Sequence, residues 1–193
     1  MLFRSPQRPA RSVIALFVTG EERGLLGSEQ FARHPPLPQA GALVANINLD
    51  MLVALGPLVD AVGLGMEHST LEVHARSAGR ALGVALSLDP EPKQVHFIRS
   101  DQYRFVQRGI PSIALYPGLA GKDEGATAAL KERRRAWIQT RYHSPKDKWD
   151  PSYDYEAMAQ LARLAFFTGL SVAETPEPPR WNPGDLFARF PLE

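Results

Sequence analysis

Two adjacent carboxylates are the first residues whose type and spacing suggest chemistry. In the stretch TGEERGLLGSEQF, Glu21 and Glu22 follow an apolar run and precede a segment punctuated by glycine. Neighbouring side chains point to opposite sides of extended backbone, so the pair can address two different targets. One carboxylate can hold a metal ion while the other takes a proton from water, which is the chemistry of metal-assisted peptide hydrolysis.

Further polar groups follow other apolar runs. Asp50 closes the run NINLDM, the tetrapeptide LYPG ends the run that begins at Ile113, and the segment RYHSPKDKWD carries Tyr142 and His143. Carboxylate and imidazole ligands together suit zinc, manganese or cobalt better than calcium, which prefers oxygen ligands alone. The sequence therefore predicts a transition-metal site.

Alternating strands and helices must position these residues. Near-continuous apolar runs predict interior strands over Ser12–Thr19 and Ala42–Leu49, and shorter strands over Val59–Leu64 and Ile113–Tyr116. Three- and four-residue apolar spacing predicts helices over Gly24–Ala32, Thr70–Leu82, Asp101–Gln107 and Tyr155–Val172. The fold class is α/β, in which ligands bind beyond the carboxyl ends of the strands.

Composition restricts the class of protein. A length of 193 residues, with 44% hydrophobic and 22% charged residues, is typical of one globular domain, and no apolar run reaches the roughly 20 residues that span a bilayer. The net charge of +1 gives no overall attraction to nucleic acid, so we interpret the basic cluster Lys131–Arg141 as a solvated helix face. We expect peptide partners, no nucleic acid and no membrane insertion.

Four motifs resemble one known family. TGEERGLLGSEQF, NINLDM, RSDQYRFVQRGIPSIALYPG and RYHSPKD occur in the order found in the co-catalytic zinc aminopeptidases, which are related to bacterial leucyl aminopeptidase, glutamate carboxypeptidase and glutaminyl cyclase. The resemblance implies a three-layer domain with a mostly parallel mixed sheet between helices. It also implies a zinc-activated water that removes N-terminal residues from peptides.

The resemblance assigns roles residue by residue. Glu21 would be the general base, Glu22 a ligand of one zinc together with His143, and Asp50 a ligand of the second zinc. Tyr142 would polarise the scissile carbonyl. Asp101 would lie beside the site, held by hydrogen bonds. Residues 1–174 would form the catalytic domain, and residues 175–193 a tail that docks on it through Trp181, Leu186 and Phe187.

The family's remaining ligands, a histidine and an aspartate that bridges the two metals, lie upstream of the paired glutamates. The first histidine of this chain is His34 and its first aspartate is Asp50, so residues 1–20 supply neither ligand. We therefore expect the C-terminal part of a longer enzyme, N-terminally truncated, with surface left exposed for self-association. Gln102 stands where the family pattern usually has histidine. The compartment is open, although export to the periplasm or secretion is common among full-length members.

Other interpretations of the same residues remain. The paired glutamates suit a charged helix start, Asp50 suits a turn cap, and structural hydrogen bonds suit Tyr142 and Asp101. At the level of function, the alternatives are a glutaminyl-cyclase-like acyltransferase and a non-catalytic binding module or inactive fragment.

Overall fold

The computed structural model describes residues 8–37 and 42–191 and contains one four-stranded sheet. The strands are β1 (Asn46–Leu49), β2 (Asp60–Leu64), β3 (Ala85–Ser87) and β4 (Ser112–Pro117), in the order β1-β4-β2-β3. β1 runs parallel to β4 and β2 runs parallel to β3, whereas β2 and β4 are antiparallel. The carboxyl ends of β1 and β4 therefore lie at the same edge of the sheet, as required if their following residues are to share a site.

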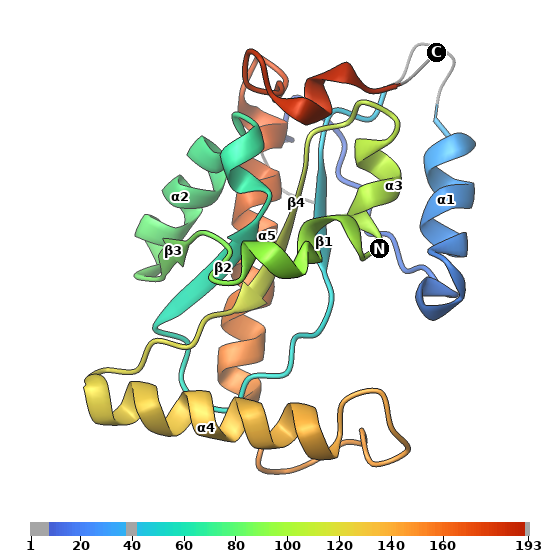
Figure 1. Cartoon of the computed structure of the whole chain (residues 1–193). Coiled ribbons are helices and arrows are strands. Elements are labelled where there is room, and N and C mark those ends of the chain that lie inside the picture. Colours follow the sequence, from blue (N-terminus) through green and yellow to red (C-terminus); the bar gives the residue numbers. More distant parts are fainter. Residues whose placement is uncertain (1–7, 38–41, 192–193) are drawn as a thin grey trace.

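Helices cover both faces of the sheet (Figure 1). On one face, α2 (Leu71–Leu82) and α5 (Tyr155–Glu174) pack against Ile113 and Leu115 in the main core. On the other face, Ala114 packs with Val106 of the short helix α3 (Gln102–Val106). This alternation along β4 is typical of a strand buried on both faces. The predicted α/β class with three layers is confirmed.

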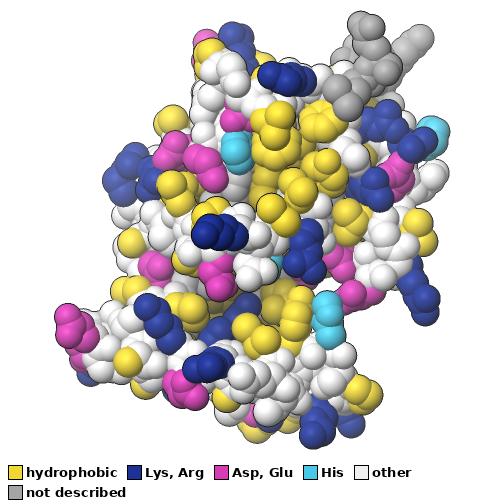
Figure 2. Space-filling model, viewed as in Figure 1, with side chains coloured by type: hydrophobic (Ala, Val, Ile, Leu, Met, Phe, Trp, Pro, Cys, Tyr) yellow, Lys and Arg dark blue, Asp and Glu magenta, His cyan; other side chains and the backbone are white. Residues whose placement is uncertain are grey.

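Two further helices extend this arrangement. α1 (Leu26–Arg33) packs on the outside of α3, with the Phe31 and Phe105 ring centroids 6.2 Å apart. α4 (Glu124–Thr140) lies across the sheet's lower edge in Figure 1, below the β4 arrowhead. Most of its side chains are exposed, and Figure 2 shows side chains of both charges over this part of the surface, as expected for a solvated helix face.

The strand predicted over Ser12–Thr19 is absent from the structure. This segment has no regular secondary structure, and four of its apolar residues are exposed: Val13 (51%), Ile14 (45%), Phe17 (94%) and Val18 (36%). β1 forms an edge of the sheet, and no described strand pairs with its free side. An apolar run becomes an interior strand only where neighbouring strands bond its backbone and other layers cover its side chains, and here neither is provided.

The other predicted elements are confirmed with shifts at their ends, the largest being that β1 begins at Asn46 instead of Ala42. β3 was not predicted, and within α4 only the part that overlaps Lys131–Arg141 was expected to be helical. The segment after α5 packs back on the sheet through Phe187, which is buried, and through Trp181, whose Nε1 donates to the Gly109 carbonyl at 3.0 Å. Leu186 is 64% exposed, so the expectation that it docks is wrong. No helix among the described residues is both long and apolar enough to cross a membrane.

Candidate metal and peptidase site

The paired glutamates lie in a tight turn. Glu21 and Glu22 begin a single 3-10 turn, Glu21–Arg23, bounded by Gly20 with φ 77° and Gly24 with φ 102°. Glycine adopts this left-handed backbone without the steric cost that a side chain adds, so the two glycines allow the chain to reverse sharply here. Glu21 is half-buried and Glu22 is exposed, so the two residues face different surroundings, although they lie in a turn and not in the extended backbone that the sequence argument assumed.

The structure brings Glu22 and His143 together. His143 Nε2 lies 2.9 Å from Glu22 Oε1, although the two residues belong to segments far apart in the sequence. His143 follows the end of α4 and has φ 53°, a left-handed conformation that costs a residue with a side chain about 1–2 kcal/mol. The turn after α4 therefore holds the imidazole toward the glutamate at a cost in local backbone energy.

Tyr142 lies beside this pair. Its ring stacks on the His143 ring with centroids 3.8 Å apart and planes inclined by 28°, and its side chain is 37% exposed. Burial raises the pKa of Tyr142, and the negative charges of Glu22 and Asp50 raise it further. The hydroxyl therefore keeps its proton at neutral pH and can donate a hydrogen bond.

Asp50 follows β1 directly and is held by a polar network. Asp50 Oδ2 accepts from the Ser100 hydroxyl at 2.9 Å, and Asn48 Nδ2 donates to Ser100 Oγ at 3.3 Å and to Gln102 Oε1 at 2.8 Å. The next residue, Met51, has φ 54°. Strained backbone of this kind is often found at functional sites, and here it flanks a predicted metal ligand.

Asp101 occupies the position just before α3. Its Oδ1 accepts from the buried Ser28 hydroxyl at 2.5 Å. Burial raises the pKa of Asp101 and the Ser28 hydrogen bond opposes that rise, while the charge of Asp50 adds to it. This hydrogen bond ties Asp101 to α1.

Negative charge gathers around Glu21. Burial is the largest cause that raises the pKa of Glu21, followed by the charges of Asp50, Glu22 and Asp101, while His143 opposes the rise. Each of these three carboxylates destabilises the ionised form of Glu21. A cation bound among them would relieve that repulsion.

Four polar residues of this neighbourhood were not singled out from the sequence. They are Ser28, Asn48, Ser100 and Tyr116, and the first three bond to the predicted residues or to Gln102. Burial raises the pKa of Tyr116, the charge of Asp50 raises it further, and a hydrogen bond with Ser100 opposes both. Their position in the sequence could have marked two of them, because Asn48 and Tyr116 lie near the carboxyl ends of the parallel strands β1 and β4, where ligands bind in α/β sheets.

The Glu22 and His143 side chains fit one divalent ion. Two ligand atoms that each lie about 2.0–2.2 Å from a zinc ion are separated by little more than the 2.9 Å found between Glu22 Oε1 and His143 Nε2. Among residues 8–37 and 42–191, no three His, Cys, Asp or Glu side chains form a group that could hold a metal. The pair therefore offers two ligands of one ion.

Comparisons with known proteins identify the family and the fold. The model of peptidase family M28 matches residues 1–168. The zinc aminopeptidase BSAP from Bacillus subtilis is 20% identical with a TM-score of 0.55, and the match covers 83% of this chain and 36% of that protein. An aminopeptidase from Aneurinibacillus sp. strain AM-1 is 21% identical with a TM-score of 0.53, covering 87% of this chain and 35% of the other.

At these identities the structural likeness concerns the fold, and the chain spans little more than a third of the length of the two solved structures. A comparison with curated proteins gave no match. The family model extends over most of the chain and includes Glu21, Glu22, Asp50, Asp101, Tyr142 and His143. The chain therefore belongs to peptidase family M28.

Proposed function

We propose that this chain carries part of the site of a metal-dependent aminopeptidase, an exopeptidase that hydrolyses N-terminal residues of peptides. The observation that supports this most directly is the 2.9 Å approach of His143 Nε2 to Glu22 Oε1, with the second glutamate of the pair beside it. A carboxylate and an imidazole are ligands that zinc prefers. Membership of a peptidase family gives the reaction class.

In this proposal each residue has a distinct task. Glu22 and His143 would hold a zinc ion, and Asp50 would be a ligand of a second ion. Zinc supplies Lewis acidity, which lowers the pKa of a coordinated water. Glu21 accepts a proton from the attacking water and later returns it. Burial and the acidic neighbours raise the pKa of Glu21, which brings it closer to the pH at which a general base works.

Tyr142 and Asp101 have supporting tasks. The Tyr142 hydroxyl keeps its proton and donates to the carbonyl oxygen as negative charge develops on it. Asp101, bonded to Ser28, fixes α1 against α3 beside the acidic group. The roles of base, ligand and hydrogen-bond donor thus fall on different residues.

Zinc titration against a chelating indicator tests the metal assignment. We expect the wild-type chain to bind zinc, and Glu22→Gln to weaken that binding by about ten-fold or more, because a neutral amide is a poorer ligand. Glu132→Gln is the matched control, since Glu132 is an exposed acid on α4 outside the site. Equal affinity in wild type and Glu22→Gln would remove Glu22 from the ligand set.

Hydrolysis of an aminoacyl anilide separates the base from the ligands. The proposal requires Glu21→Gln to bind zinc as tightly as wild type while losing turnover by about 100-fold or more. Unchanged turnover in Glu21→Gln would exclude it as the base. Zinc binding without turnover in the wild type would instead limit the chain to the metal-holding part of the activity.

A further inference from the structure

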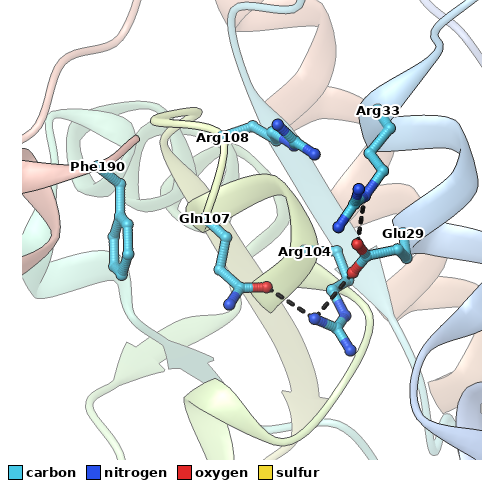
Figure 3. A pocket seen from close by; sticks show the side chains of 6 residues that line it. All are labelled: Glu29, Arg33, Arg104, Gln107, Arg108 and Phe190. Carbon is cyan, nitrogen blue, oxygen red and sulfur yellow. Dashed lines mark hydrogen bonds and ion pairs between the residues drawn. The ribbon is translucent and has the colours of Figure 1, made fainter. Parts of the chain in front are cut away.

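A second site of different chemistry lies between α1 and α3. A pocket of about 240 Å³ is lined by two residues of α1, by three residues of α3 and its end, and by one residue near the C-terminus: Glu29, Arg33, Arg104, Gln107, Arg108 and Phe190. Figure 3 shows these side chains, and Figure 2 shows basic side chains gathered on this part of the surface. None of them belongs to the peptidase site proposed above.

The charges in this pocket are unbalanced. Three arginines line it and Glu29 is the one acidic lining residue, so two formal positive charges are in excess. Glu29 already accepts from Arg33 Nε, and its Oε2 lies 2.8 Å from Arg104 Nη1. The Arg33 hydrogen bond, together with the charges of Arg104 and Arg108, lowers the pKa of Glu29, so the carboxylate is ionised. Both of its oxygens already contact an arginine.

Two of the arginines that line the pocket carry nitrogen donors without a partner among the described residues. The Nε atom of Arg104 is buried and has no hydrogen-bond partner in the described part of the chain. The guanidinium group of Arg108 makes no hydrogen bond or ion pair with residues 8–37 or 42–191, and Arg108 is exposed. Unpaired donors of this kind are costly when buried, and a planar guanidinium presents two of them side by side to an oxyanion.

The remaining contacts of Arg104 hold its guanidinium in place. Arg104 Nη1 donates to Gln107 Oε1 at 2.9 Å, and Nη2 donates to the Gly24 carbonyl at 2.9 Å. Figure 3 shows Arg33 and Arg108 extending from α1 and from the end of α3. The site is thus formed by one arginine with fixed contacts and by two that approach from different elements.

We propose that this pocket binds a phosphate-type oxyanion, either free phosphate or the phosphoryl group of a monoester. Two excess positive charges match a dianion better than a single carboxylate, and arginine forks suit its tetrahedral oxygens. The volume suits a small ligand, and Phe190 provides a half-buried aromatic surface at the rim for an organic group attached to the phosphate. This binding is independent of the peptidase proposal.

Isothermal titration calorimetry of the full chain with inorganic phosphate, at constant ionic strength, tests the proposal. We expect one phosphate per chain with a dissociation constant of about 1 mM or tighter, and about ten-fold weaker binding in Arg108→Gln. The matched control is Arg163→Gln, because Arg163 is an exposed arginine paired with Glu156 on α5, far from the pocket lining. Circular dichroism confirms that each variant is folded.

Titration with phenyl phosphate distinguishes the two sources of the ligand. Tighter binding of phenyl phosphate than of inorganic phosphate identifies a monoester whose organic group contacts Phe190, and equal binding identifies free phosphate; both results support the site. Absence of saturable binding by the wild type overturns the proposal. Equal weakening by Arg108→Gln and Arg163→Gln also overturns it, because that result indicates a general effect of surface charge.

Discussion

Gln102 is a buried polar residue of the hydrogen-bond network that also includes Asn48, Ser100 and Asp50. Its side chain is 0% exposed, its Nε2 donates to the Phe97 carbonyl at 2.7 Å, and its Oε1 accepts from Asn48 Nδ2 at 2.8 Å. Asn48 also bonds Ser100, which in turn donates to Asp50. Gln102→Leu keeps a side chain of similar size while removing both hydrogen bonds.

The expected cost follows from the groups left without partners. A buried polar group that loses its partner costs about 1–3 kcal/mol, and the variant leaves the Phe97 carbonyl and one Asn48 donor in that state. Burying leucine in place of an amide returns about 1–2 kcal/mol. We therefore expect Gln102→Leu to lower the free energy of unfolding by about 1–4 kcal/mol.

Urea unfolding followed by circular dichroism measures this loss. The control is Gln30→Leu, at an exposed position of α1, which should change the free energy of unfolding by less than about 0.5 kcal/mol. If Gln102→Leu is as stable as this control, the hydrogen-bond network contributes no net stability. That result would refute the reasoning that the buried amide of Gln102 stabilises the fold through its two hydrogen bonds.

Three further predictions concern other parts of the chain. Burial, and to a smaller extent the charge of Arg11, lowers the pKa of His74 below its ordinary 6.5. The unfolded chain therefore binds the proton first, and the free energy of unfolding decreases as the pH drops below 6.5. Urea unfolding at several pH values should show a smaller decrease in His74→Leu than in wild type, and an equal decrease would contradict this. Phe17, 94% exposed in an apolar segment, should promote self-association, which sedimentation velocity should find reduced in Phe17→Lys; equal association of both proteins would argue against this surface. Leu161 is 0% exposed in the main core, and Leu161→Ala should lower the free energy of unfolding by about 2–5 kcal/mol in urea, whereas a loss below about 1 kcal/mol would mean that the core collapses around the cavity.

Local periodicity was sufficient for most elements. The spacing of apolar residues predicted α2 and α5 within two residues of their observed ends. Each helix buries one face in the core, so apolar residues recur along it every three or four positions. β3 was missed because three residues carry too little pattern, and its pairing with β2 decides its conformation. The strand predicted over Ser12–Thr19 does not form, because an apolar composition favours burial only where neighbouring elements cover the segment, and here they do not.

The candidate site divides in the same way. The positions of Glu21, Glu22, Asp50 and His143, after apolar runs or in polar loops, are enough to mark them as chemically interesting. Their mutual geometry does not follow from those positions, because it depends on where α4 ends and on the left-handed backbone of His143. The roles of Ser100 and Asn48 could not be predicted for the same reason, since serine and asparagine carry no distinguishing pattern of their own.

By itself, the sequence determined the class of the fold, most of its helices and strands, and the acidic and imidazole groups that could bind a metal. Tertiary structure alone decided that Glu22 and His143 approach to 2.9 Å, that Gln102 is buried in a hydrogen-bond network, and that three arginines of α1 and α3 face one pocket. The physical reason is the separation along the chain over which each effect acts. Periodicity and turn chemistry act over a few neighbouring residues, whereas a site is formed by contacts between segments that only the packing of the whole sheet brings together.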